Sequence, residues 1–249
     1  MENKSKYPFP AYIECLPYEP LLPDYTPEEK LDAVLAKDEV MNVMGARNYY
    51  YACNDLQAVL DNLWVQEPEN RATASLGANW GFYIGFDEIQ RYVSESWPAA
   101  EMGAVSQSVN TPLIYVAFDR KTARGIWYCD GYYCDRKGNT EAVYQKVAVD
   151  FIREGDSWKI WHLVSGADIA DSLYTDPLSA GHDGLKLLEK WFGTPTVSCT
   201  THDPRYNWND NYPPEPEAYE TFSLRSSYAP EGCPRYRRYM REVKKHAKK

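Results

Sequence analysis

Lys146 and His162 are ionisable side chains that lie within apolar, strand-like stretches of this 249-residue chain. Alternation along a strand puts Lys146 on the face of Tyr144, and it puts His162 on the face of Ile160. Desolvation in a closed cavity favours the neutral form of a lysine, which can then act as a base or stabilise a developing anion. A solvent-exposed lysine and a histidine that fills the core are the alternatives.

Three consecutive tyrosines, Tyr49 to Tyr51, offer hydroxyl groups near the end of a predicted helix. Their side chains point about 100° apart, so one or two can face a pocket while the others pack on a sheet. We expect Tyr50 to exchange a proton with a substrate hydroxyl. The chain contains 21 Tyr and 8 Trp, a composition that suits a half-wet cavity or an interface.

Amide and aromatic side chains complete the predicted site. Asn79 and Trp80 follow a short glycine-rich strand that should meet the mouth of the pocket. Asn79 equally suits a plain turn. The substrate contacts expected from the residues themselves are Tyr51, Asn79, Trp80, Trp127 and Tyr144. Such a set favours a bulky aromatic ligand, which would stack on the rings.

A block of strands between Thr111 and Leu163 must position these side chains. β-Branched and aromatic residues dominate the runs 112–118, 123–129, 143–152 and 157–163, and Asp, Gly and Lys separate them. This pattern predicts long antiparallel strands joined by hairpins.

Helices are predicted before this block. Thr26 can cap a helix that has Pro27 in its first position, and Leu31, Val34 and Leu35 share one face of it. A second helix should begin near Asp55, and a third at Phe86. The predicted fold is α+β, with helices packed on a curved antiparallel sheet. We expect an extended arm over 1–27, the α+β domain over 28–168 and a Pro/Tyr-rich extension over 169–249.

Composition excludes several function classes. A formal net charge of −9 argues against nucleic-acid binding. The basic run 235–249 is predicted to be a terminal helix, frayed or docked on a neighbouring subunit. We expect no membrane span and a cytoplasmic protein. The six cysteines form no CxxC pair and the four histidines are scattered, so neither a disulfide nor a metal site is expected.

Several of these motifs resemble the NTF2-like superfamily, and in particular its SnoaL-like branch. The run 85–89, Gly-Phe-Asp-Glu-Ile, is similar to the start of the family's third helix. Residues 110–116 resemble its long strand, and 121–128 with 149–162 resemble its last hairpins. The resemblance covers roughly residues 40–165. It implies a cone-shaped domain with a pocket between helices and sheet, no cofactor, and assembly into a dimer or trimer.

The chain departs from this family at the site itself. Asn48, Cys53 and Gln107 stand nearest the family's Tyr, Asp and His, so the usual acid and base groups are absent there. Tyr50 and Asp55 keep the same spacing two positions later. The resemblance therefore adds Asn48, Asp55 and Gln107 to the expected substrate contacts.

A Leu-Trp pair that ends the second helix and a Pro/Tyr-rich C-terminal extension resemble the diarylpropane lyases, which release formaldehyde from lignin-derived diols. The resemblance implies a cofactor-independent lyase that acts on a phenolic molecule. A dehydratase, isomerase or cyclase with a polycyclic substrate is one alternative, and a non-catalytic small-molecule-binding module is another.

Overall fold

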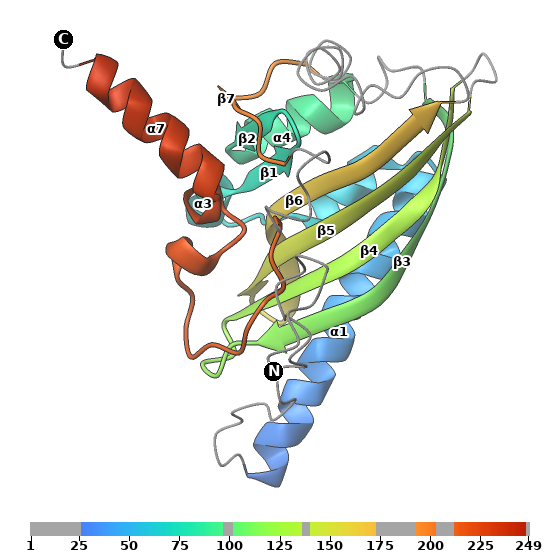
Figure 1. The fold of residues 1–249 in the computed structure, drawn as a ribbon. Helices are drawn as coiled ribbons and strands as arrows, with labels where there is room; N and C mark the ends of the chain where they lie inside the picture. Colours follow the sequence, from blue (N-terminus) through green and yellow to red (C-terminus); the bar gives the residue numbers. More distant parts are fainter. Residues whose placement is uncertain (1–25, 97–101, 136–139, 173–192, 203–211, 248–249) are drawn as a thin grey trace, which may run out of the picture.

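Long, curved antiparallel strands form the centre of the structure, with helices on one side and the C-terminal segment on the other (Figure 1). The computed structural model describes residues 26–96, 102–135, 140–172, 193–202 and 212–247. The predicted N-terminal arm lies almost entirely outside the described residues. The division of the chain at 168 and 169 stays a prediction.

Seven strands of the described residues form one sheet in the order β3-β4-β5-β6-β1-β2-β7. All neighbours are antiparallel except β1 and β6, which run parallel. The strands are β1 (Ser75–Ala78), β2 (Gly81–Ile84), β3 (Met102–Val116), β4 (Thr122–Asp135), β5 (Thr140–Glu154), β6 (Ser157–Ser172) and β7 (Val197–Ser198). The predicted α+β fold is confirmed. The first long strand begins ten residues before Pro112, because 102–111 is too polar to read as a strand by composition.

The first helix, α1 (Pro27–Ala52), begins where the sequence predicts. The backbone N–H of Glu29 donates to Thr26 Oγ1 at 3.3 Å, and the Glu29 carboxylate accepts the N–H of Thr26 at 2.8 Å. This reciprocal pair satisfies free amides at the helix start. The other helical segments are α2 (Leu56–Ala58), η1 (Val59–Leu63), α3 (Pro68–Thr73), α4 (Phe86–Arg91), η2 (Tyr92–Ser96), η4 (Leu224–Ser226), η5 (Pro230–Gly232) and α7 (Pro234–His246).

The two faces of the sheet carry separate cores. On the side that we call the helix face, side chains of β4 to β6 pack with buried residues of α1, η1 and α4. On the opposite side, which we call the C-terminal face, Ile126, Ala148 and Val164 pack against Tyr212 and Tyr228. The C-terminal segment therefore covers a face that would otherwise be apolar and exposed.

A β-bulge in β6 changes which side chains share a face. Phe151 pairs with Ile160, but the preceding Asp150 pairs with His162, so Trp161 is an extra residue between the two pairs. One extra residue shifts the following side chains to the other face. The prediction that His162 shares the face of Ile160 is therefore wrong: Ile160 belongs to the helix-face core, whereas His162 meets Asp150 on the C-terminal face.

A substitution at Phe151 can test the packing of the helix-face core. It is fully buried, and its ring packs edge-on against Trp127 with centroids 6.1 Å apart. We expect Phe151→Ala to lower the free energy of unfolding by about 3–5 kcal/mol, because it removes buried area and leaves a cavity. Chemical denaturation measures the loss. As a control, Tyr49→Ala at a 77% exposed position should change stability by about 0.5 kcal/mol or less. Equal losses in both variants would contradict this packing.

Candidate functional site

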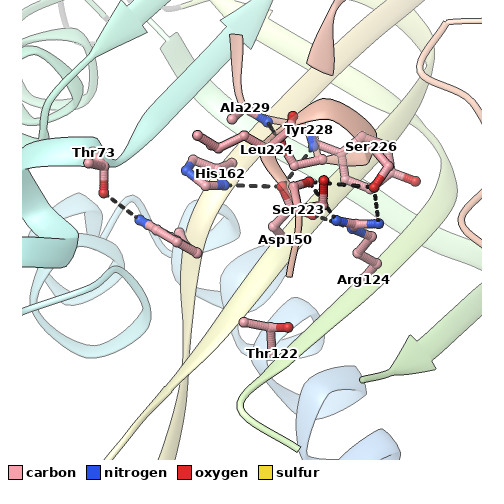
Figure 2. Close-up of polar contacts among 12 residues, drawn as sticks. Thr73, Thr122, Arg124, Asp150, His162, Ser223, Leu224, Ser226, Tyr228 and Ala229 are labelled. Carbon is pink, nitrogen blue, oxygen red and sulfur yellow. Dashed lines mark hydrogen bonds and ion pairs between the residues drawn. The ribbon is translucent and has the colours of Figure 1, made fainter. Parts of the chain in front are cut away.

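The C-terminal face contains a buried network of charged side chains (Figure 2). Asp150 Oδ1 accepts a hydrogen bond from Arg124 Nε at 3.0 Å, and its Oδ2 lies 3.0 Å from His162 Nδ1. Because a carboxylate only accepts, the hydrogen lies on Nδ1 of His162. Asp150 and His162 are 0% exposed, and Arg124 is 3% exposed.

The C-terminal segment closes this network. The backbone N–H of Tyr228 donates to Asp150 Oδ2 at 2.7 Å. Arg124 donates to the Ser226 hydroxyl and to the Ser223 carbonyl, both at 3.2 Å. Phe222 covers the stacked rings of Trp161 and His162. A ligand has no route to these atoms while the segment is in place, so the network is an anchor for the segment.

Ser75, Asp150 and His162 invite comparison with a nucleophile, an acid and a base, since Ser75 pairs with His162 between β1 and β6. The hydrogen-bond pattern does not fit that chemistry. Neither Ser75 Oγ nor His162 Nε2 has a hydrogen-bond partner among the described residues, and both residues are 0% exposed. A nucleophile requires contact with its base and with a substrate, and Ser75 has neither.

The structure separates the three predicted catalytic residues. Lys146 is buried and alternates with Val147, so it lies on the C-terminal face, opposite Tyr128 of β4. His162 lies on the same face, whereas Tyr50 of α1 packs partly buried against the helix-face core. The expectation that the three converge on one pocket is wrong, because the sheet stands between Tyr50 and the other two.

A second group of polar side chains lies on the helix face, around Arg47 of α1. The guanidinium of Arg47 lies over the Tyr51 ring, 4.6 Å from its centroid. Gln107 Nε2 donates to the hydroxyl of Tyr133 at 2.5 Å, and Asn48 Nδ2 donates to the Gln107 carbonyl at 3.5 Å. We call Arg47, Asn48, Tyr51, Tyr92, Gln107 and Tyr133 the Arg47 cluster. Within it, only the tyrosines at 51 and 92 are buried, and the other four side chains are partly exposed.

Burial sets the electrostatics of the Arg47 cluster. It raises the pKa values of Tyr51, Tyr92 and Tyr133, and the nearby charge of Arg47 opposes the rise in each case. The same cause raises the pKa of the adjacent Cys129 thiol to about 11. At neutral pH these groups are therefore uncharged. The cluster combines one cation with neutral hydroxyl and amide groups, and it contains no carboxylate or imidazole.

Part of the Arg47 cluster was predictable from the sequence. Asn48, Tyr51 and Gln107 were expected contacts and do lie in it. Arg47, Tyr92 and Tyr133 were missed, although Arg47 is four residues from Tyr51, a spacing that places both on one side of a helix. Tyr92 and Tyr133 carried no signal, because neither belongs to a motif.

The other expected contacts lie outside the cluster. Asn79 donates from Nδ2 to the Ala167 carbonyl and accepts the Ala167 N–H, both at 2.8 Å. It therefore ties the β1–β2 turn to β6. Trp80 Nε1 donates to the Tyr83 hydroxyl at 3.0 Å, and Asp55 Oδ1 caps α2 by accepting the N–H of Ala58 at 3.1 Å.

Two aromatic side chains predicted to contact substrate are also elsewhere. Trp127 is buried in the helix-face core, where its ring lies over Gly125. A Cβ at Gly125 would meet that ring at 2.3 Å, so the position requires glycine. Tyr144 is 47% exposed, and it pairs with Asp130 near a register shift.

The structure offers little support for other site types. The described residues include no group of three or more His, Cys, Asp or Glu side chains that could hold a metal ion. Among the described helices, none has the length and apolar character needed to cross a bilayer.

Comparisons with known proteins reveal only distant structural likeness. No family model and no curated protein matches the chain. A hexachlorocyclohexane dehydrochlorinase from Novosphingobium barchaimii superposes with 12% identity and a TM-score of 0.48, over 58% of this chain and 94% of its own. An NTF2-like superfamily protein from Salmonella enterica has 14% identity and a TM-score of 0.47, over 54% and 92%. The second belongs to the superfamily that the sequence resembles. At these values the activity must be argued from the residues of this chain.

A substitution at Asp150 can test whether the buried network anchors the C-terminal segment. We expect Asp150→Asn to lower the free energy of unfolding by about 3–5 kcal/mol, because Arg124 would stay buried without its counter-charge. Hydrogen exchange at the Tyr228 amide should accelerate, since its acceptor is weakened.

The matched control is Asp119→Asn. Asp119 is exposed and accepts hydrogen bonds from the Lys121 N–H and the Thr221 hydroxyl. Its replacement should cost about 1 kcal/mol or less. An Asp150→Asn protein as stable as this control would show that the network does not hold the C-terminal segment.

Proposed function

We propose that the Arg47 cluster binds an aromatic small molecule that carries an anionic oxygen, such as a carboxylate or a phenolate. The observation that carries the proposal is the partly exposed residue Arg47, a cation among neutral donors, with the Tyr133 hydroxyl and the Asn48 amide in the same cluster. A charge-assisted hydrogen bond to Arg47 would hold the oxygen, and the neutral groups would orient it.

The aromatic character of the ligand follows from the rings around the cation. Tyr83 and Tyr92 pack with centroids 4.7 Å apart, and Tyr51 lies under Arg47. These rings are buried, so they would form an apolar wall of the site, which suits an aromatic ligand. Raised tyrosine pKa values keep the hydroxyls protonated, so they do not repel an anion.

The second candidate is the cofactor-independent lyase that the family resemblance implies. The same arrangement favours it, because a cation and hydroxyl donors would also stabilise the oxyanion that develops in an elimination or a retro-aldol cleavage. Tyr50, one residue from Tyr51, would supply or accept the proton. A dehydratase, isomerase or cyclase reaction would use the same groups.

Binding is tested by calorimetric titration with aromatic carboxylates and phenols, each beside a neutral isostere. We expect the anionic members to bind more tightly. Arg47→Gln should weaken them by roughly 10- to 100-fold, the value of a hydrogen bond to a charged group. Tyr133→Phe should weaken them by about 3- to 10-fold.

Arg71→Gln is the matched control, because Arg71 also lies over a ring, that of Phe86 at 3.7 Å, but outside the cluster. It should leave affinity unchanged. Equal binding of anionic and neutral ligands, or equal loss in the Arg47 and Arg71 variants, would refute the proposed site.

Lyase activity is tested with a diarylpropane diol and an assay for formaldehyde. We expect turnover that Tyr50→Phe reduces at least about 100-fold in kcat, the usual contribution of a positioned proton donor. Tyr49→Phe, at the exposed neighbour, should retain the rate. If ligands bind but neither diols nor polycyclic alcohols turn over, the lyase is rejected and the binding function stands.

A further inference from the structure

The C-terminal helix α7 presents an amphipathic surface: Tyr236 packs on Phe82 with ring centroids 5.6 Å apart, whereas Tyr239, Met240 and Val243 stay partly or largely exposed. Tyr236, Tyr239, Met240 and Val243 recur at the spacing of one helical face. Six Arg and Lys residues against one Glu make the rest of the helix basic, in a chain of formal net charge −9. None of its residues is buried, and Figure 1 shows α7 projecting from the sheet.

A groove of about 750 Å³ runs beside this helix. Leu224, Tyr236 and Met240 supply its apolar part. Its charged lining residues are four basic ones, Arg225, Arg237, Arg241 and Lys244, and one acidic one, Glu231. Arg237 fixes the wall of the groove by donating to the backbone carbonyls of Arg225 and Glu231 at 3.3 and 3.0 Å. A groove of this composition fits an amphipathic helix with acidic residues.

The N-terminal half of α1 is such a helix. Leu31, Val34 and Leu35 are 59%, 65% and 53% exposed, whereas the buried side of α1 is formed by Ala36, Val40 and Met44. The three exposed residues share one face of α1, and this face points away from the buried side of the helix. Residues 27–41 contain five acidic and two basic side chains.

We infer that the α7 groove of one copy of this chain binds the N-terminal half of α1 of a second copy. The two surfaces have the same helical period, each exposes apolar side chains, and their charges are opposite. In Figure 1 the two helices project at different ends of the molecule. In a dimer with a two-fold axis, α1 of each chain would lie in the α7 groove of the other chain. Both contacts would then be buried.

The C-terminal segment limits which surfaces a second copy can contact. It covers much of the C-terminal face of the sheet, including Ile126, Ala148 and Val164, so that part of the sheet is closed to a second copy. The helices α1 and α7 remain accessible. Complementary charges across a contact determine register and exclude wrong partners.

Exchange of charges tests the inference by sedimentation velocity over a range of protein concentrations. The wild-type chain should dimerise, less tightly as salt is raised. The acid-face variant Glu28→Lys/Asp38→Lys and the base-face variant Arg241→Glu/Lys244→Glu should each raise the dimer Kd at least about tenfold. An equimolar mixture of the two variants should form a heterodimer, because one contact then joins two unchanged surfaces and the other joins two reversed ones. For the same reason the chain with all four changes should dimerise again.

The matched control is Glu69→Lys/Asp156→Lys, which makes the same charge change at exposed positions that belong to neither helix and do not line the groove; its Kd should equal that of the wild type. Circular dichroism confirms that each variant is folded. A monomeric wild type, a dimer insensitive to both reversals, or a mixture that stays monomeric would overturn the inference. So would a monomer that binds an oligonucleotide or anionic vesicles through Arg241 and Lys244, since α7 would then serve another partner.

Discussion

The carboxylate of Asp150 is a buried negative charge, and its neutralisation requires three distant parts of the chain. Arg124 comes from β4, 26 residues away, His162 from β6, 12 residues away, and the Tyr228 amide from the C-terminal segment, 78 residues away. Removing a carboxylate from water costs several kcal/mol unless each lone pair finds a donor. The network is therefore stable only when sheet and segment are assembled together, and this requirement gives the segment one position.

Because the C-terminal segment covers the C-terminal face of the sheet, the candidate ligand site lies on the helix face. On the C-terminal face, Arg124, Asp150 and His162 contact one another and are buried, so they are not available to a ligand. On the helix face, the Arg47 cluster combines the guanidinium of Arg47 with hydroxyls that burial keeps protonated. Charged side chains in a fold of this kind do not mark a reactive site by themselves. Partial exposure distinguishes the Arg47 cluster from the anchor.

Local signals predicted the elements well, because capping and periodicity depend on neighbouring residues. Thr26 caps the first helix as expected, the second helix begins after Asp55 as predicted, and the hairpins fall where turn residues interrupt apolar runs. Side-chain direction was harder to predict, because it depends on register. A bulge at Trp161 moved His162 to the other face, and a composition-based reading has no signal for a single unpaired residue. The tyrosines at 92 and 133 reach Arg47 only through tertiary packing.

The dependence between Asp150 and the C-terminal segment has an evolutionary reading. Without the segment, Arg124 and Asp150 would be an ordinary ion pair on the surface, worth little. Without the pair, the segment would be an apolar cover with several equivalent ways to lie on the sheet. The ion pair and the segment each stabilise the fold only when the other is present. Selection therefore acts on the two together. Related chains should therefore have both or neither.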